Sequence, residues 1–155
     1  MRALVFALLL TFAGCGALDV FEPADPLVAD CVPQFCMSAE IWKKLGSDWS
    51  ANYNEVYYCM QGDRSVTRLL KPEQVGYRNI VYPTQCPGGT FGNVHTHPSG
   101  SCILNDGDLR HFAFYPKHQV AMVVCGADRF GYQMKGDSYD YIKVYPDSMR
   151  RVRGT

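Results

Sequence analysis

Residues 91–109 read FGNVHTHPSGSCILNDGDL, and this stretch decides how the rest of the chain is interpreted. Its first part is typical of a β-strand, which Pro98 brings to an end. A loop follows, and Asn105 then begins a predicted helix as its N-cap. Because the strand ends at the proline, His95 and His97 are expected at the rim of a sheet, where a ligand can arrive.

Further helices and strands are predicted on both sides of this stretch. The first predicted helix begins at Ser38, its N-cap, and places Ile41, Trp42 and Leu45 on one face. Gly46 either ends this helix or weakens it. The predicted strands cover residues 56–60, 65–70, 79–82, 91–97, 119–125, 130–134 and 139–145, and the second helix covers 105–115. The order of helix, strands, helix and strands predicts an α+β domain with a mixed β-sheet flanked by helices.

Length and composition limit the classes of protein that this chain can belong to. It has 155 residues, enough for one hydrophobic core and too few for two ordinary domains. Hydrophobic residues make up 47% and charged residues 19%, which excludes disorder as the main state. The 15 basic and 15 acidic residues give a formal net charge of zero, so we expect no nucleic-acid partner.

The N-terminus has the pattern of an export signal. In residues 1–14 a single arginine precedes an apolar run that is too short to span a bilayer, which is typical of a secretory signal peptide. Residues 12–15 read FAGC, which is similar to the lipobox of bacterial lipoproteins. That similarity implies membrane attachment through a lipidated Cys15, and cleavage after Ala17 is the alternative. Both predict an exported chain.

Export changes the interpretation of the cysteines, because it permits disulfides. Residues 15–37 are rich in proline and are predicted to form a tether and an irregular lead-in, and residues 38–155 form the domain. Six cysteines follow Cys15, and the sequence does not choose how they pair. They are Cys31, Cys36, Cys59, Cys86, Cys102 and Cys125. No C-x-x-C pair is present, which argues against a zinc knuckle.

Two histidines and one aspartate form the candidate metal site. His95 and His97 are two residues apart in a strand, so their side chains leave the same face at a spacing that one metal ion can bridge. Asp108, in the first turn of the next helix, can face back to this rim. Three protein ligands leave a fourth zinc position to water, which is the form of a catalytic site. Alternatively, Asn105 and Asp108 only cap the helix and complement its dipole, which is compatible with ligation.

On these residues the chain resembles the JAMM (MPN+/JAB1) metalloprotease family. The spacing His95-x-His97-x7-Asn105-x2-Asp108 is similar to the family motif H-x-H-x7-S-x2-D, and Asn105 is the one departure from it. The resemblance covers roughly residues 38–145. It implies an MPN/JAB1-like, cytidine-deaminase-like single domain.

The family also has a glutamate just ahead of its first buried strand. Glu55 fits that pattern, because the apolar residues 56–60 and then Gly62 follow it. Glu40, in the first helix, and Glu73, in a loop, are the alternatives. The resemblance implies that Glu55 acts as general base and then as general acid.

The activity implied by the resemblance is zinc-dependent hydrolysis of an amide bond in a peptide or protein substrate. One zinc per chain is held by His95, His97 and Asp108 and activates a water molecule. Asn105 takes the place of the family serine, and its amide can donate a hydrogen bond to the oxyanion. The alternative function is a binding or scaffold module with little or no activity, as in MPN relatives that have lost ligands.

Other enzyme classes fit less well. A zinc deaminase needs H-x-E and P-C-x-x-C, and neither string is present. RadC-like relatives share the His-x-His-Pro-Ser-Gly string but are intracellular. A thiol protease could use Cys102, although a disulfide is the more economical role for it in an exported chain. His111 is interpreted as a helix-surface residue, with contact behind the metal site as the alternative, and His118 as exposed. Residues 84–90 are candidates for a flap.

Overall fold

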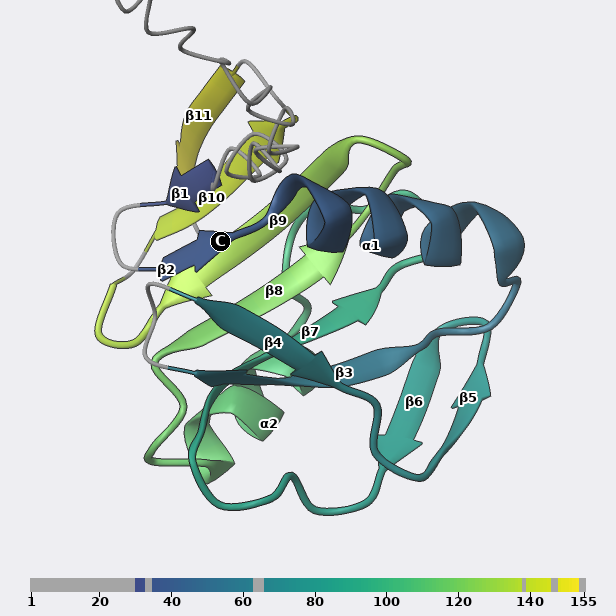
Figure 1. Cartoon of the computed structure of the whole chain (residues 1–155), viewed down its shortest axis with the longest axis vertical. Helices are drawn as coiled ribbons and strands as arrows, with labels where there is room; N and C mark the ends of the chain where they lie inside the picture. Colours follow the sequence, from purple (N-terminus) through teal and green to yellow (C-terminus); the bar gives the residue numbers. More distant parts are fainter. Residues whose placement is uncertain (1–29, 33–34, 63–65, 138, 146–147, 154–155) are drawn as a thin grey trace, which may run out of the picture.

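The computed structural model describes residues 30–32, 35–62, 66–137, 139–145 and 148–153 (Figure 1). The predicted signal peptide, Cys15 and most of the predicted tether lie outside the described residues. Within the described part of the chain, neither helix has the length and apolar character that spanning a membrane requires.

A seven-stranded mixed sheet is the centre of the fold (Figure 1). From one edge to the other its strands are β11 (Ser148–Arg153), β10 (Tyr139–Val144), β9 (Arg129–Met134), β8 (Val120–Val124), β7 (Thr90–Thr96), β3 (Tyr57–Gly62) and β4 (Thr67–Leu70). β7 and β8 are parallel, and the other neighbouring pairs are antiparallel. A parallel pair needs a crossover, which α2 (Asp106–Phe114) provides.

Two further hairpins lie outside this sheet. β1 (Asp30–Val32) pairs with β2 (Phe35–Met37), and β5 (Gln74–Tyr77) pairs with β6 (Ile80–Pro83). Both pairs are antiparallel. The β5–β6 hairpin matters for the site, because it lies beside the segment that leads into β3.

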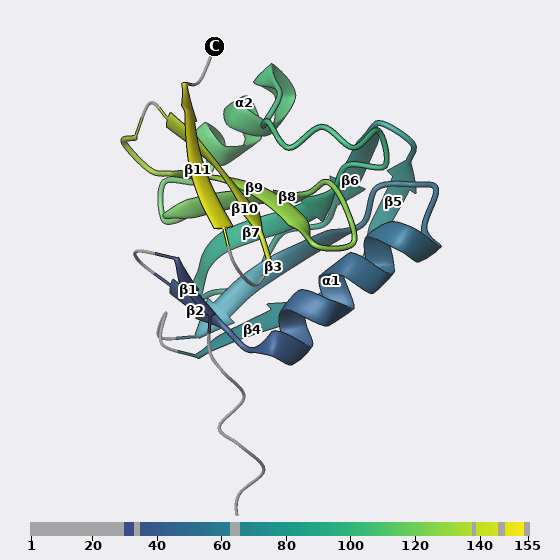
Figure 2. The same ribbon diagram turned by 90° about the horizontal axis from the view of Figure 1, so that it is seen from above.

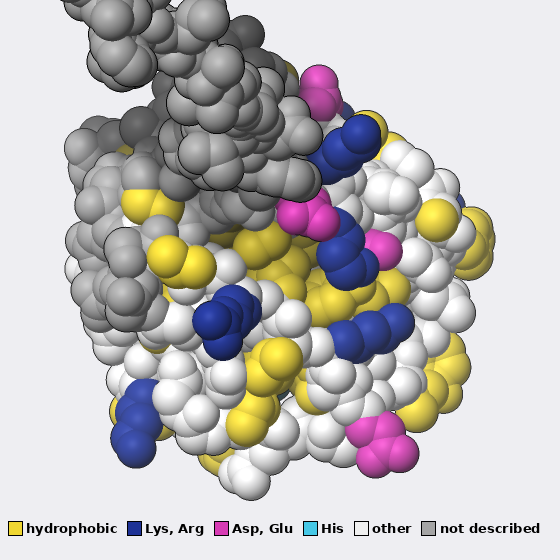
Figure 3. Space-filling view, viewed as in Figure 1, with side chains coloured by type: hydrophobic (Ala, Val, Ile, Leu, Met, Phe, Trp, Pro, Cys, Tyr) yellow, Lys and Arg dark blue, Asp and Glu magenta, His cyan; other side chains and the backbone are white. Residues whose placement is uncertain are grey.

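The two helices lie on opposite faces of the sheet (Figure 2). α1 (Ala39–Ala51) is capped by Ser38, whose hydroxyl accepts a hydrogen bond from the backbone N–H of Ile41 at 3.3 Å. Its buried residues Trp42 and Leu45 join the larger core. Figure 3 views the molecule from the α1 side, and no histidine of the described residues is visible there. The fold is therefore α+β, with a mixed sheet flanked by helices, as the sequence predicts.

Strand alternation divides the side chains of the sheet between these two faces. One row across neighbouring strands joins Tyr58, Val94, Met122 and Tyr132, which all belong to the core beneath α1. The adjacent row points to the α2 side and joins Tyr57, His95, Val123 and Gly131. The same alternation that builds the core therefore assigns His95 to the opposite face.

Gly46 does not end α1, because the helix continues to Ala51. A Cβ atom at Gly46 would overlap the backbone carbonyl of Ala127. The glycine therefore serves close packing between the helix and the chain that leads into β9.

Three short or polar elements differ from the sequence-based expectations. An irregular lead-in is expected up to residue 37, but Phe35 and Met37 form β2 and are buried in the core at 2% and 0% exposure. A strand of three residues is too short to show periodicity. β5 was not predicted, because three of its four residues are glycine, glutamine or an exposed tyrosine. β11 was not predicted either, because its sequence contains three arginines.

Candidate metal centre

β7 and its extension position the two histidines. His95 pairs with Tyr57 of β3 and with Val123 of β8, so a neighbouring strand fixes its backbone on each side. His97 follows the last residue of β7, and its backbone N–H donates to the carbonyl of Val124 at 2.7 Å. Both side chains are buried, at 5% and 4% exposure. The strand pattern thus places both imidazoles on the α2 side, as expected.

The first turn of α2 supplies the third residue. The side-chain oxygen of Asn105 accepts hydrogen bonds from the backbone N–H groups of Gly107 and Asp108, at 2.7 and 3.1 Å. In return the Asp108 carboxylate accepts a hydrogen bond from the backbone N–H of Asn105 at 2.7 Å. This reciprocal capping box fixes the carboxylate, while its oxygens also face the histidines. The capping role and the ligand role are therefore compatible.

The candidate ligand atoms of the three residues lie within 4.8 Å of one another. The Nε2 atoms of His95 and His97 are 3.0 Å apart. Asp108 Oδ1 lies 3.1 Å from His95 Nε2, and Asp108 Oδ2 lies 3.3 Å from His97 Nε2. Ligands about 2.0–2.1 Å from one tetrahedral zinc are about 3.3–3.4 Å apart. His95, His97 and Asp108 can therefore hold a metal ion, and the donor set suits zinc.

Hydrogen bonds on the far side of His97 fix its ring. Its Nδ1 lies 2.9 Å from the carbonyl oxygen of Ser101 and donates to it, which leaves Nε2 facing Asp108. Its own carbonyl accepts from the Trp49 indole N–H at 2.8 Å and from the Gly100 N–H at 2.9 Å. A ligand held on both sides in this way has its metal-facing nitrogen preorganised.

The charges of the three residues depend on one another. Burial lowers the pKa of His95, so this imidazole is neutral, as a metal ligand must be. At His97 burial is outweighed by the hydrogen bond and charge of Asp108 and by the Ser101 carbonyl, and the pKa is raised. Burial alone would raise the pKa of Asp108, but the two histidines lower it well below its ordinary range. Asp108 is therefore an anion at neutral pH.

Glu55 is the glutamate that the fold brings to this site. It is buried at 6% exposure and lines the same cavity as His95 and Asp108. Its backbone N–H donates to the carbonyl of Tyr77 at 2.7 Å, and a Cβ at Gly76 would overlap its carbonyl, so hairpin β5–β6 packs directly against it. Burial raises the pKa of Glu55 to about 7, the nearby His97 lowers it, and Asp108 raises it further. The alternatives Glu40 and Glu73 are both exposed and do not line this cavity.

A cavity of about 430 Å³ opens beside the three ligands. Its lining includes Glu55, His95, Asn105 and Asp108, together with aromatic and aliphatic side chains of β3, the β5–β6 hairpin and α2. Asn105 uses its side-chain oxygen for the helix cap. Its amide nitrogen has no hydrogen-bond partner among the described residues, so this group is the one available to a ligand.

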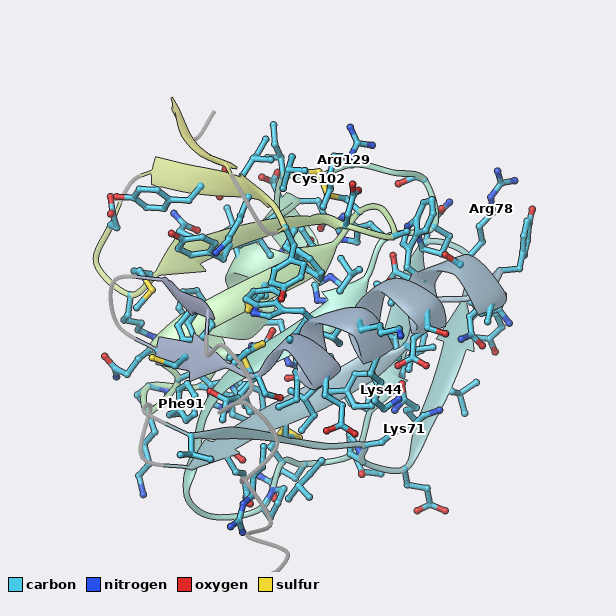
Figure 4. All side chains as sticks on the ribbon, turned by 45° about the horizontal axis from the view of Figure 1, so that its top comes forward. Lys44, Lys71, Arg78, Phe91, Cys102 and Arg129 are labelled. Atoms are coloured by element: carbon cyan, nitrogen blue, oxygen red, sulfur yellow. A yellow bond between two sulfur atoms is a disulfide. The ribbon has the colours of Figure 1, made fainter. Side chains whose placement is uncertain are left out.

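Two disulfides hold segments next to this face of the sheet. Cys59 of β3 is bonded to Cys86, which anchors the candidate flap at residues 84–90. Cys102, which lies in the loop after β7 and is labelled in Figure 4, is bonded to Cys125, the residue that directly follows β8. Cys102 is therefore not available as a thiol nucleophile, and its predicted disulfide role is confirmed. Both bonds fit an oxidising environment outside the cytosol.

Sequence reasoning missed several residues that surround the site. The prediction that His118 is exposed is wrong, because its exposure is only 3%. It stacks on Tyr115 at 4.8 Å, and its Nδ1 lies 3.3 Å from the Asn93 side-chain nitrogen. Burial, with smaller contributions from His111 and Lys135, lowers the pKa of His118 to about 4. A single polar residue ahead of an apolar strand carries no signal of such burial.

His111 contacts a residue beside the metal ligands rather than a ligand itself. Its Nε2 is 3.1 Å from the hydroxyl of Tyr57, and the Tyr57 ring stacks near His95 with centroids 6.4 Å apart. The structure therefore supports the alternative interpretation of His111, contact behind the metal site, over an open position on the helix surface. Tyr57 itself could have been found from its position two residues after Glu55 on the same face of the strand.

The structure is similar to the crystal structure of a JAB1/MPN domain protein from Archaeoglobus fulgidus, with a TM-score of 0.43 and 25% sequence identity. The match covers 61% of this chain and 83% of the archaeal chain. No protein-family model matches the sequence, and no curated protein matches it.

Proposed function

We propose that the protein is a zinc-dependent peptidase or isopeptidase of the JAMM type, with one zinc per chain. The observation that carries the proposal is the close grouping of the His95 and His97 Nε2 atoms with the Asp108 carboxylate, at distances of 3.0–3.3 Å, beside a cavity that is also lined by the buried Glu55. A zinc hydrolase uses this combination of three protein ligands, one open position and one proton carrier.

A bound zinc ion supplies Lewis acidity, which brings the pKa of water down to about 7 and polarises a carbonyl group. The protein residues do the rest. Asp108 would contribute a negative charge, and neutral His95 and His97 would each contribute a nitrogen lone pair, so three protein ligands would hold the ion. His97 is turned toward the same point by the Ser101 carbonyl.

Glu55 is proposed to carry the proton. Glu55 lines the same cavity as His95 and Asp108, so its carboxyl group would be placed to accept a proton from the attacking water and to release it to the leaving amine. The backbone of Glu55 is fixed by the Tyr77 carbonyl, so its carboxyl group stays beside the ligands. Asn105 is proposed to donate from its free amide nitrogen to the oxyanion.

The alternative function is an inactive binding module of the same fold. One observation favours it, namely that Asn105, at the position of the family serine, uses its side-chain oxygen to cap α2. The two functions differ in turnover and in their need for metal, because a binding module can work without a bound ion.

We also propose that the chain is exported and attached to a membrane through a lipidated Cys15, with a peptide or protein as substrate. The support for export is the pair of disulfides together with the apolar N-terminal segment. Radiolabelled palmitate incorporation that is lost on Cys15→Ser tests the anchor directly.

The function is tested in two steps on the purified full chain. Elemental mass spectrometry should find about one zinc per chain, lost on His97→Ala while circular dichroism stays unchanged. An internally quenched peptide library should then be cleaved by the native protein and not by Glu55→Gln, whereas the exposed Glu73→Gln serves as matched control and keeps activity. Bound zinc without any cleavage would favour the inactive module, and no bound zinc would overturn the peptidase and leave the binding module.

A further inference from the structure

The cavity beside the metal centre is larger than the metal centre requires. Its volume of about 430 Å³ lies within the range of about 300–1,000 Å³ that is usual for ligand sites. Beyond Glu55, His95, Asn105 and Asp108, much of its wall is aromatic or aliphatic. The side chains that matter are Tyr57, Ile80, Tyr82, Phe114 and Tyr115.

The inner wall of this cavity is fixed by aromatic contacts. Tyr57 is buried at 3% exposure, and its hydroxyl is hydrogen-bonded to His111 Nε2 at 3.1 Å. The His111 ring contacts Tyr115 with centroids 4.9 Å apart, and Tyr115 in turn stacks on buried His118 at 4.8 Å. This series of rings is preorganised, so little ordering is needed when a ligand enters.

The outer part of the cavity leaves large apolar side chains in water. Phe114 is 75% exposed, Tyr82 is 59% exposed and Ile80 is 44% exposed. Phe114 comes from the last turn of α2 and the other two from β6, so they approach the cavity from two elements. An occupant that covers them removes apolar surface from water, which favours binding.

The charges of the cavity select among occupants. Among the described residues that line it there is no lysine or arginine, while Glu55 and Asp108 both contribute carboxyl groups. Against the apolar outer wall formed by Ile80, Tyr82 and Phe114, an acidic side chain would be desolvated with no cationic side chain among the described lining residues, which is costly. A basic side chain would lose its hydration against the same apolar wall. A neutral aromatic side chain meets neither penalty and can pack against the existing rings.

We propose that this cavity is a side-chain subsite, and that it selects peptides with an aromatic residue next to the scissile amide and rejects those with an acidic residue there. The inference rests on the proposed function, because the subsite adjoins the same metal centre. Phe114 and Tyr82 are its specificity-determining residues, and Tyr57 with Tyr115 forms its fixed wall.

Peptide binding tests the inference without needing turnover. Short acetylated and amidated peptides are titrated calorimetrically into zinc-loaded Glu55→Gln, with Phe, Leu, Ala or Glu at each of the two positions that flank one central amide. Each flanking position gives one series of four peptides. In the series whose varied side chain enters the cavity, we expect the Phe peptide to bind at least about tenfold more tightly than the Glu peptide. Phe114→Ala, added to this background, should weaken the Phe peptide by about three- to tenfold. Tyr53→Ala, also strongly exposed at 66% but outside the cavity, is the matched control.

The possible results separate the subsite from the proposed hydrolysis. Equal binding of the Phe and Glu peptides in both series, or no binding of any peptide, would overturn the subsite. Equal loss of affinity in Phe114→Ala and Tyr53→Ala would overturn it too. Aromatic preference in Glu55→Gln without any cleavage by the native protein would support the subsite and overturn the peptidase. Cleavage of Phe and Glu peptides at equal rates would keep the peptidase and overturn the subsite.

Discussion

The Nδ1 atom of His97 lies 2.9 Å from the carbonyl oxygen of Ser101, and the residue after Ser101 is covalently joined to β8. The Cys102–Cys125 disulfide thus fixes the loop that orients a metal ligand. A Cβ atom at Gly131 would overlap the backbone carbonyl of Cys102. The loop is therefore packed closely against β9, in addition to its disulfide bond to Cys125.

Removing this disulfide should weaken metal binding. In the double variant Cys102→Ala, Cys125→Ala the Ser101 carbonyl is no longer fixed, and we expect zinc affinity to fall about 10- to 100-fold. Competition with a fluorescent zinc chelator measures the change at a temperature where circular dichroism shows both proteins folded.

The second disulfide supplies the control for this experiment. Cys59–Cys86 closes a loop of similar length, with a sequence separation of 27 against 23, so its removal should cost similar stability. It contacts no metal ligand through a hydrogen bond among the described residues. If the double variant Cys59→Ala, Cys86→Ala loses as much zinc affinity as Cys102→Ala, Cys125→Ala, the loss comes from a general loosening of the fold. The specific role of the Ser101 loop is then refuted.

Glu55→Gln should stabilise the metal-free protein at alkaline pH. The fold raises the pKa of Glu55 from 4.5 to about 7, so the folded state holds this proton more tightly than the unfolded state. Its contribution to stability is full below pH 4.5 and is lost as the pH rises to about 7. Glutamine does not ionise, so we expect the variant to be more stable by about 1–2 kcal/mol at about pH 8 and unchanged at about pH 4. Urea unfolding in a chelator measures this, and a pH-independent difference would contradict it.

His118 should make the protein sensitive to acid. Its pKa falls from 6.5 to about 4 on folding, so the unfolded state binds a proton first as the pH drops. The contribution of neutral His118 is full above pH 6.5 and is lost as the pH falls to about 4. Glutamine does not take up this proton. Across this pH interval, the free energy of unfolding of the metal-free His118→Gln variant should therefore fall by about 1–3 kcal/mol less than that of the native protein. The neighbouring exposed Lys117→Gln should follow the native curve, and parallel curves for all three proteins would refute the prediction.

Substitutions at Asn105 separate its capping role from its proposed catalytic role. Asn105→Ala removes the cap and should destabilise the protein by about 1 kcal/mol, whereas Asn105→Ser keeps a capping oxygen and a donor. Asn105→Asp keeps the capping oxygen and loses the amide donor. We expect Asn105→Ser to retain peptide cleavage and Asn105→Asp to lose about 10- to 1,000-fold in kcat. Full activity in Asn105→Asp would limit this residue to the cap.

The part of the site that lies close together in the sequence was predictable from it. His95 and His97 share a strand face, Pro98 ends the strand, and Asn105 with Asp108 opens a helix, so local rules are sufficient to place these residues. Glu55 was harder to place, because only the sheet register and the packing of hairpin β5–β6 bring it to the cavity. The α+β fold followed from the order of elements.

Long-range packing explains what the sequence did not reveal. His118 is buried because Asn93, which is distant in the sequence, and the nearby Tyr115 close around it. The disulfide partners of Cys59 and Cys102 depend on which strands are neighbours, which cysteine spacing alone does not state. Hairpin β5–β6 has little strand signal of its own, and its place beside Glu55 depends on the close approach that Gly76 permits.

The three candidate ligands come from one short stretch, residues 95–108, while Glu55 comes from the segment that leads into β3 and depends on a separate hairpin for its place. The two parts of the site can therefore be lost separately. A descendant that loses Glu55 would keep all three candidate ligands, so one substitution would be enough to turn the proposed enzyme into a protein that only binds the ion. The reverse change would have to restore a carboxyl group that is remote in the sequence from those ligands.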